Sequence, residues 1–148
     1  MKKQEEKCDM LRLDKQLCFP LYACAKEVVR RYKPFLDELD LTYTQYITMM
    51  VMWEKKEINV KCLGKILYLD SGTLTPVLKK LEWKGYLTRE RSKEDERNLR
   101  VMITDKGIKL KGLAEEVPMK VGKCVKLEAE EAEQLYELLY KVLGCMDA

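Results

Sequence analysis

The most reactive side chains in this sequence belong to six cysteines, Cys8, Cys18, Cys24, Cys62, Cys124 and Cys145. As a thiolate, a cysteine can attack a peroxide, form a disulfide or bind a metal ion. An even number of cysteines can indicate a disulfide framework, but such frameworks are typical of small secreted domains. No two of these cysteines form a Cys-x-x-Cys pair, so neither a thioredoxin-type motif nor a zinc ribbon is indicated.

Histidine is absent from the sequence. Its absence excludes a Ser-His-Asp triad, a Cys-His pair and every zinc site that needs an imidazole ligand. Cysteines and carboxylates could still form a metal sensor, but no cluster of them has a recognisable ligand spacing. We therefore expect a protein that is not an enzyme and that has no metal ion or cofactor.

Basic side chains are concentrated in the middle of the chain. The formal net charge of the 148 residues is only +3, so the total does not point to a nucleic-acid partner. Residues 61–100, however, contain ten basic and six acidic side chains, whereas residues 128–148 contain one and six. This asymmetry predicts a surface for duplex DNA in the middle of the chain.

An ordered scaffold must hold these side chains, and the composition permits one. Hydrophobic residues make up 47% of the chain, which is enough for the core of a single domain spanning residues 1–148. The charged N-terminus is not followed by an apolar stretch, and the most apolar run, Ile47–Trp53, is far too short to cross a bilayer. We therefore expect a cytoplasmic protein without a membrane partner.

The first predicted helix lies between Asp14 and Leu39, where apolar residues recur every three or four positions. Asp14 could cap this helix. Because proline is tolerated only near the start of a helix, the helix either starts near Gln16–Phe19 or starts at Asp14 and bends at Pro20. Pro34 predicts a second bend or a boundary.

Three further helices are predicted in the middle of the chain. Thr42 and Gln45 form a capping box at the start of the first one. The second is short, Asn59–Leu67, and the third covers about Ser71–Lys84, with Gly85 in the place of a C-cap. The apolar face of the third helix consists of Leu74, Val77, Leu78 and Leu81.

After the third helix the spacing of apolar residues becomes alternating. Two strands are predicted, Tyr86–Arg91 and Leu99–Thr104, and the seven residues between them, Ser92–Asn98, are polar. Helix, short helix, helix and charged hairpin is the order of a winged helix-turn-helix, which we place at residues 41–106. The predicted fold is therefore mainly α, of the α+β class.

Apolar helices flank the winged unit on both sides. Thr104 and Asp105 begin a helix that is predicted to continue to about Cys124, and a last helix starts near Leu127. In a chain this small, the flanking segments, residues 13–40 and 107–146, have only each other and a partner subunit to cover their apolar faces. We expect them to form the dimerisation region of a homodimer, with packing inside one chain as the alternative.

The third helix of the winged unit is the element that enters the major groove of DNA. Hydroxyl groups near its start can reach phosphates or base edges, and a proline ring can contact a thymine methyl group. The hydroxyl groups could instead only cap the helix. The candidate contacts are Ser71, Thr73, Thr75, Pro76 and Lys79.

Arg97, in the polar loop, is predicted to enter the minor groove, whose negative potential attracts arginine. Asp95 or Glu96 could hold Arg97 through a charge-assisted hydrogen bond. A solvated loop of mixed charge is the plainer interpretation. Further candidates for phosphate contact are Arg89, Arg91, Lys65 and Lys84.

Several of these segments form motifs. Four segments closely resemble motifs of the MarR family of dimeric winged-helix regulators; they are Leu69–Pro76, Lys79–Glu82, Arg89–Ser92 and Glu94–Arg97. Two further segments resemble motifs of the organic hydroperoxide resistance (OhrR) branch of this family, namely Gln16–Tyr22 and Leu41–Tyr46. The resemblance covers nearly the whole chain, from about Leu13 to Leu143.

The resemblance implies that Cys18 is a peroxide sensor. It also implies that Tyr32 and Tyr43 donate hydrogen bonds to the sensor thiolate from the partner subunit, and that Tyr22 lies near the site. Such a regulator represses a peroxidase gene by binding double-stranded operator DNA, and an organic hydroperoxide releases it by oxidising the cysteine.

The residues around Cys18 are consistent with that role. If the first helix begins near Pro20, the thiol lies at the positive end of the helix, which favours a thiolate, as phenolic donors also do. The apolar neighbours Leu17, Phe19 and Leu21 suit organic peroxides better than hydrogen peroxide. Without the resemblance, Cys18 would be interpreted as a small buried hydrophobic residue.

A sulfenic acid on Cys18 can condense with a second thiol. Some members of the branch use a resolving cysteine late in the chain, for which Cys124 lies in about the right region, and others use a small-molecule thiol. Cys24 is interpreted as a packing residue. No role is assigned to Cys8, Cys62 or Cys145.

Two other functions stay open at this stage. The first is a repressor of the same family that a small aromatic ligand releases, bound in a cleft between the dimerisation and DNA-binding regions. The second is a thiol peroxidase or redox enzyme that uses Cys18, which ranks last because histidine is absent and the DNA-reading elements are complete.

Overall fold

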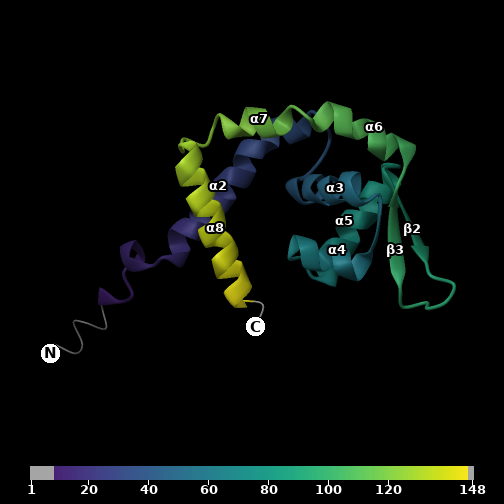
Figure 1. Ribbon diagram of the computed structural model, residues 1–148, viewed down its shortest axis with the longest axis horizontal. Coiled ribbons are helices and arrows are strands. Elements are labelled where there is room, and N and C mark those ends of the chain that lie inside the picture. Colours follow the sequence, from purple (N-terminus) through teal and green to yellow (C-terminus); the bar gives the residue numbers. More distant parts are fainter. Residues whose placement is uncertain (1–8, 147–148) are drawn as a thin grey trace. The chain divides into compact units, whose positions relative to one another are not determined.

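The computed structural model describes residues 9–146. Contacts divide them into two compact units, one that ends at Val117 and one that begins at Pro118. None of the described helices combines the length and the apolarity that a membrane crossing needs. Figure 1 labels the helices and strands of both units.

The first unit begins with a short 3-10 helix, η1 (Leu13–Lys15), and a long helix, α2 (Cys18–Asp37). The later of the two predicted starts is therefore confirmed, and Pro20 lies in the first turn, where its missing N–H is not needed. The prediction that Asp14 caps this helix is wrong, because Asp14 belongs to η1. The helix continues past Pro34 for three residues, so the boundary lies beyond the proline.

The winged unit contains the three predicted helices, α3 (Tyr43–Lys55), α4 (Val60–Leu67) and α5 (Ser71–Trp83). The capping box is confirmed, because the Gln45 N–H donates to Thr42 Oγ1 at 3.3 Å and the Thr42 N–H donates to Gln45 Oε1 at 3.2 Å. The buried side chains of these helices form the core, with Met49, Met52, Leu63, Leu74, Leu78 and Leu81 almost fully enclosed.

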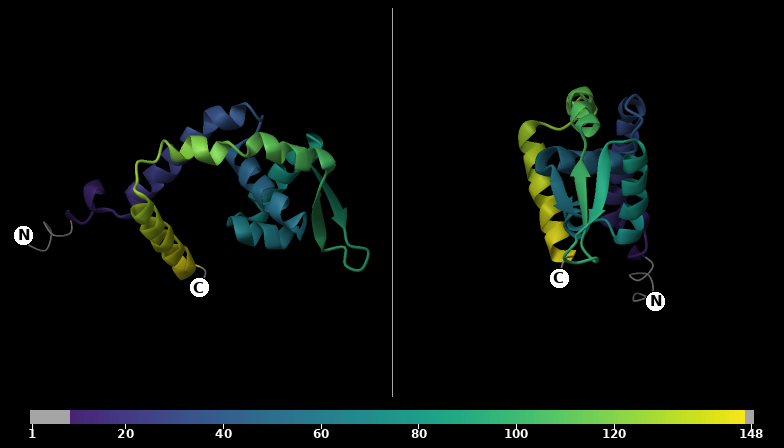
Figure 2. Two further views of the ribbon diagram at one scale, coloured as in Figure 1. Left: turned by 45° about the horizontal axis from the view of Figure 1, so that its top comes forward. Right: turned by 90° about the vertical axis from the view of Figure 1, so that its right-hand side faces the viewer.

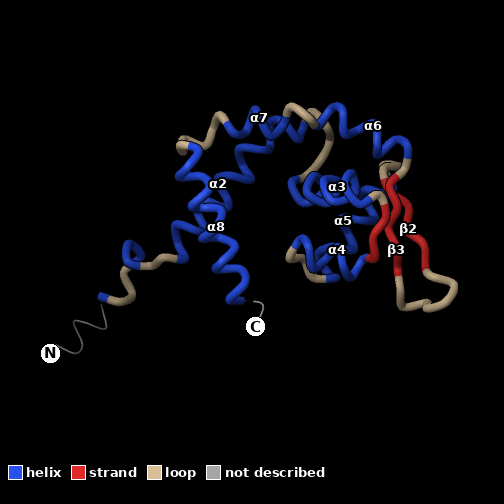
Figure 3. The backbone as a smooth tube through the Cα atoms, viewed as in Figure 1, coloured by secondary structure: helices blue, strands red, loops and turns tan. Residues whose placement is uncertain are grey.

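A three-stranded antiparallel sheet has the order β1-β3-β2, formed by β1 (Glu57–Asn59), β2 (Leu87–Arg91) and β3 (Leu99–Ile103). The hairpin of β2 and β3 is confirmed, whereas β1 was not predicted. Figure 2 shows β2 and β3 side by side, joined by the loop that forms the wing. In Figure 3 the strands, drawn in red, lie at one end of this unit beside α3, α4 and α5.

The prediction of a single helix after the wing is wrong, because the observed helix is interrupted. It is divided into α6 (Asp105–Ala114) and α7 (Val117–Gly122). Pro118 explains the break, because a proline ring clashes with the carbonyl group four residues earlier, which is that of Ala114. The last helix, α8 (Ala129–Met146), lies in the second unit and is confirmed.

Candidate sensor cysteine and DNA-binding surface

Cys18 is the first residue of the 20-residue helix α2, and it is exposed. The interpretation of Cys18 as a small buried residue is therefore wrong for the single chain. The other described cysteines, Cys24, Cys62, Cys124 and Cys145, are also free and exposed, so Cys24 does not pack within the single chain. Cys8 lies outside the described residues.

The surroundings of Cys18 are apolar but open to solvent. Leu17 is 82% exposed, while Phe19 and Leu21 are about half as accessible, at 42% and 41%. Tyr22 follows Cys18 by four residues, which places it one turn further on the same face of α2. An apolar peroxide can therefore approach the thiol over exposed hydrocarbon surface. Within residues 9–146, no cluster of potential ligands could hold a metal ion.

The two tyrosines assigned to the sensor by resemblance lie together. The ring centroids of Tyr32 on α2 and Tyr43 on α3 are 5.0 Å apart. A third ring, Tyr46, lies 5.7 Å from Tyr32 and 6.4 Å from Tyr43. Tyr46 was given no role from the sequence, although its position one turn after Tyr43 places both on one side of α3.

Burial disfavours ionisation of the three tyrosines in this cluster. It raises the pKa of Tyr32 above the ordinary value of 10.0. Burial also raises the pKa of Tyr43 and of Tyr46, and the negative charges that neighbouring phenolates would carry raise both further. All three phenols are therefore protonated at neutral pH and keep an O–H group that can donate a hydrogen bond.

The tyrosine pair and the cysteine of one chain are far apart. Cys18 and Tyr32 are on the same helix, 14 residues apart in the numbering, which corresponds to about 21 Å along the helix axis. A hydrogen bond spans about 3 Å. The two tyrosines therefore cannot contact Cys18 of their own chain while α2 is intact.

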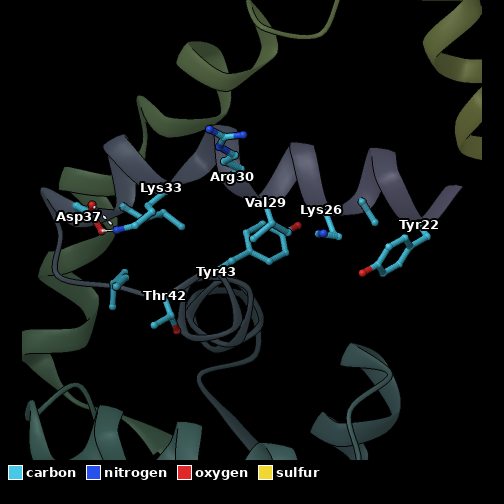
Figure 4. Close-up of a pocket in the computed structure, with 11 residues that line it drawn as sticks. Tyr22, Lys26, Val29, Arg30, Lys33, Asp37, Thr42 and Tyr43 are labelled. Carbon is cyan, nitrogen blue, oxygen red and sulfur yellow. Dashed lines mark hydrogen bonds and ion pairs between the residues drawn. The ribbon is translucent and has the colours of Figure 1, made fainter. Parts of the chain in front are cut away.

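A groove of about 690 Å³ lies between α2 and α3. Figure 4 shows Tyr22 and Lys26 projecting from the side of α2 that faces α3, and Tyr43 projecting from the start of α3 toward Val29. The lining of the groove also includes Lys33, whose ammonium group lies 2.8 Å from the Asp37 carboxylate. The groove therefore combines hydrocarbon and phenol surface with cationic side chains along α2.

Helix α5 has its predicted DNA-facing residues near its start. Asp70 is the N-cap, since its carboxylate accepts a hydrogen bond from the Thr73 N–H at 2.8 Å. The capping alternative for the hydroxyl side chains is therefore wrong. The other candidates on α5 are exposed, apart from half-buried Thr75; they are Ser71, Pro76 and Lys79.

The wing loop places Arg97 in solvent. Asp95 does hold Arg97 through a charge-assisted hydrogen bond, but the donor is the backbone of Arg97 and not its guanidinium. The Asp95 carboxylate accepts a hydrogen bond from the Arg97 backbone N–H at 3.0 Å, which leaves the guanidinium unrestrained by this contact. The guanidinium of Arg91 donates to the Glu96 carbonyl at 3.0 Å and so also shapes the loop.

Two of the weaker phosphate candidates have partners inside the protein. The Arg89 guanidinium makes two hydrogen bonds with Glu82, at 2.8 and 3.0 Å. The Lys84 ammonium group donates to the Asp40 carbonyl and to Gln45 Oε1, the latter at 3.2 Å. Both side chains therefore stabilise the winged unit, a role that the sequence did not reveal because the partners come from other elements.

Element order, sheet and exposed recognition helix together define a winged-helix transcriptional regulator, and an exposed thiol at the start of α2 adds a reactive group. The family model described as "Transcriptional regulator SarA/Rot" matches residues 30–112. The organic hydroperoxide resistance transcriptional regulator of Bacillus subtilis (strain 168) is 45% identical over 139 residues, which are 94% of this chain and 95% of that protein.

Solved structures show the same similarity. AbfR of Staphylococcus epidermidis, reduced and bound to DNA, is 32% identical and has a TM-score of 0.76 over 96% of this chain and 99% of that one. AbfR is also known overoxidised on DNA (TM-score 0.74) and with a disulfide (TM-score 0.66), each 31% identical, covering 99% and 98% of this chain and 99% of AbfR. A MarR mutant from E. coli with operator DNA is 26% identical, with a TM-score of 0.74 over 86% and 93%.

The chain belongs to the MarR family of winged-helix transcriptional regulators and matches its SarA/Rot type. The predicted resemblance to this family and to its organic hydroperoxide resistance branch is confirmed. The predicted fold class is confirmed as well.

Proposed function

We propose that the chain is a redox-sensing transcriptional repressor that binds operator DNA as a homodimer and is released when an organic hydroperoxide oxidises Cys18. The proposal is carried by an exposed thiol at the first residue of a long helix, in a member of this regulator family. Support comes from the B. subtilis relative, which is named for organic hydroperoxide resistance, and from AbfR, which has been solved reduced, overoxidised and with a disulfide.

The chemical step is a two-electron oxidation of sulfur. The Cys18 thiolate attacks the terminal oxygen of the hydroperoxide, the O–O bond breaks, and the alkoxide that leaves takes a proton to become an alcohol. The sulfur becomes a sulfenic acid, which condenses with a second thiol to a disulfide and releases water. That thiol is supplied by Cys124, in the turn after α7, or by a small molecule.

The partner subunit completes the sensor in this proposal. Because Tyr32 and Tyr43 cannot reach Cys18 in their own chain, they act on the thiolate of the other chain. The segments expected to dimerise are largely uncovered: Leu36 is the one buried residue of α2, and α8 has none. Their exposed apolar side chains include Leu21, Val28, Val29, Leu135, Leu138 and Val142.

In this proposal, α5 and the wing bind the operator DNA. The start of α5 enters the major groove and Arg97 enters the minor groove, with Asp95 shaping the loop that presents the guanidinium. The proposed contacts are Ser71, Thr73, Thr75, Pro76, Lys79, Arg91 and Arg97.

The decisive experiment uses a Cys18→Ser variant and operator duplexes selected from a random DNA pool with the reduced wild-type protein. Each protein is treated with tert-butyl hydroperoxide, its modified cysteines are identified by mass spectrometry, and its operator affinity is measured at fixed salt. We expect the wild type to be modified at Cys18 and released, and Cys18→Ser to stay bound.

Cys24→Ser is the matched control, because Cys24 is exposed and lies on the same helix. It should be released like the wild type. Normal release of Cys18→Ser by the hydroperoxide would refute the proposal.

A second candidate function is favoured by the groove between α2 and α3. Its volume of about 690 Å³ and its lining of Tyr22, Val29 and Tyr43 would accommodate a small aromatic ligand. In that case a phenolic compound would release the reduced protein from DNA in the absence of any oxidant. Release of Cys18→Ser by such a compound would favour this function over the first.

A further inference from the structure

A line of buried aromatic side chains follows α3 from the tyrosine pair to the other end of the helix. Tyr46 touches both Tyr32 and Tyr43, and its ring meets Trp53 edge-on at a centroid distance of 6.4 Å. Tyr46 and Trp53 are seven residues apart, so they lie on one face of α3, and they are only 3% and 8% exposed. On the side of Tyr46, the half-buried tyrosine pair therefore packs against buried rings.

Trp53 ends this line in a specific hydrogen bond. Its indole Nε1–H donates to the carbonyl oxygen of Gly107 at 2.8 Å, in a buried position and across 54 residues of sequence. An indole has a single donor, so rotation of the ring leaves its N–H unpaired in the interior. The ring therefore has one favourable position relative to α6.

Gly107 lies where the wing and α6 meet. A Cβ atom on this glycine would be 2.4 Å from the Tyr86 carbonyl oxygen and 2.8 Å from Ile103 Cγ1, so only glycine fits. Tyr86 precedes β2, and its carbonyl also accepts the Thr104 N–H at 3.0 Å. Thr104 follows β3 and accepts the Gly107 N–H at its hydroxyl, at 3.1 Å. The backbone at both ends of the wing hairpin is thus fastened to the residue that Trp53 holds.

We infer that Trp53 is a positioning residue that couples the sensor tyrosines to the base of the wing, through Tyr46. This inference rests on the proposed function, since the tyrosines must change position when the thiol is oxidised. Closely packed interiors move between discrete arrangements and do not deform continuously. A displaced Tyr43 or Tyr32 ring therefore shifts Tyr46 and Trp53 together, and the shift reaches the wing through Gly107.

Trp53→Phe tests the coupling, because it keeps an aromatic ring and removes the side-chain donor to the Gly107 carbonyl. Trp83→Phe is the matched control, since Trp83 is 86% exposed. The measured quantity is the ratio of operator Kd values after and before treatment with tert-butyl hydroperoxide. We expect that ratio to fall about tenfold in Trp53→Phe, within the range of known allosteric couplings, while the rate of Cys18 oxidation is unchanged. Trp83→Phe should keep the wild-type ratio.

A spectroscopic test uses the fact that the chain has two tryptophans. In Trp83→Phe, Trp53 is the single tryptophan, and its emission reports on its own surroundings. Oxidation should shift that emission in Trp83→Phe and leave it unchanged in Trp83→Phe/Cys18→Ser. This measurement decides the matter even if Trp53→Phe fails to fold.

The outcomes separate the two proposals. If oxidation does not release the wild type, the proposed function itself fails. If the wild type and Trp83→Phe are released but the Trp53 emission stays constant, the function stands and the coupling is overturned. A wild-type Kd ratio in folded Trp53→Phe would overturn the coupling as well.

Discussion

Lys84 connects the end of the recognition helix to the turn between α2 and α3, and replacing it should destabilise the protein. Its side chain is 16% exposed, and its ammonium group donates to the Asp40 carbonyl and to Gln45 Oε1 and lies 3.3 Å from the Asp40 carboxylate. That carboxylate is 90% exposed, so we assign it almost no stabilisation. Gln45 Oε1 keeps its bond from the Thr42 N–H when Lys84 is removed.

The loss is therefore dominated by one hydrogen bond from a charged donor, to the Asp40 carbonyl. We expect Lys84→Met to lower the free energy of unfolding by about 2 kcal/mol, the middle of the range for such bonds. Methionine keeps the length of the chain and its contacts with neighbouring hydrocarbon, so little packing is lost. For a protein of this size the change corresponds to a melting temperature about 4–8 °C lower.

Urea unfolding at fixed protein concentration measures this loss, because the stability of the proposed dimer would depend on concentration. Lys80→Met is the control, since Lys80 is exposed and one turn earlier on the same helix. The reasoning also predicts that Lys84→Met keeps the wild-type salt dependence of operator binding, as its ammonium group is engaged inside the protein. Equal stability of the two variants, or a weaker salt dependence in Lys84→Met, would refute it.

Three further predictions follow from other parts of the structure. Arg97→Ala should weaken operator binding and reduce the slope of log K against log salt by about 1, as measured by fluorescence anisotropy. An unchanged slope would exclude an ionic contact between Arg97 and the DNA. Gly107→Ala should lower the free energy of unfolding in urea by about 3 kcal/mol or more, because the added Cβ meets the Tyr86 backbone oxygen. Gly112→Ala, in the same helix, should stabilise the protein by about 0.5–1 kcal/mol, because its added Cβ meets no atom within 4 Å. Similar values for the two variants would contradict the packing at Gly107. The raised tyrosine pKa values mean that stability from keeping these phenols neutral is fully present below pH 10.0 and is lost as the pH rises through their higher folded values. Tyrosinate absorbance, recorded together with unfolding between pH 8 and 11, checks this, and a loss of stability with tyrosinate signal below pH 9 would contradict it.

Local patterns in the sequence predicted those elements whose determinants are themselves local. The Thr42–Gln45 capping box and the apolar face of α5 are examples, because each depends on residues within one or two turns. Strand β1 escaped notice because three residues are too few for an alternating pattern, and its pairing with β3 depends on contacts 43 residues away, such as Ile58 with Val101. Pro118 alone does not predict the break before α7, because a proline is also tolerated in the first turn of a helix.

The candidate site divides in the same way. The position of Cys18 at the start of α2 was one of two alternatives that Pro20 left open, and the structure selects it. The partners of Lys84 and Arg89 could not be predicted, because they depend on how separate helices and strands pack. The connecting role proposed for Tyr46 and Trp53 could not be predicted, since nothing in their spacing reveals the contact between Trp53 and Gly107.

The separation between Cys18 and the tyrosine pair gives the proposed sensor its control over DNA binding. About 21 Å of helix lies between Cys18 and Tyr32, so in the proposed dimer each thiol is completed by tyrosines of the other chain. A change of charge and bonding at the thiol then acts across the subunit interface, where it can alter the distance between the two recognition helices. Dimeric helix-turn-helix proteins bind two half-sites that lie one turn of DNA, about 34 Å, or a multiple of it apart, so the two recognition helices must keep a matching distance. An oxidation confined to one sulfur atom can therefore release the whole dimer, provided that the interface and the wing move as connected units.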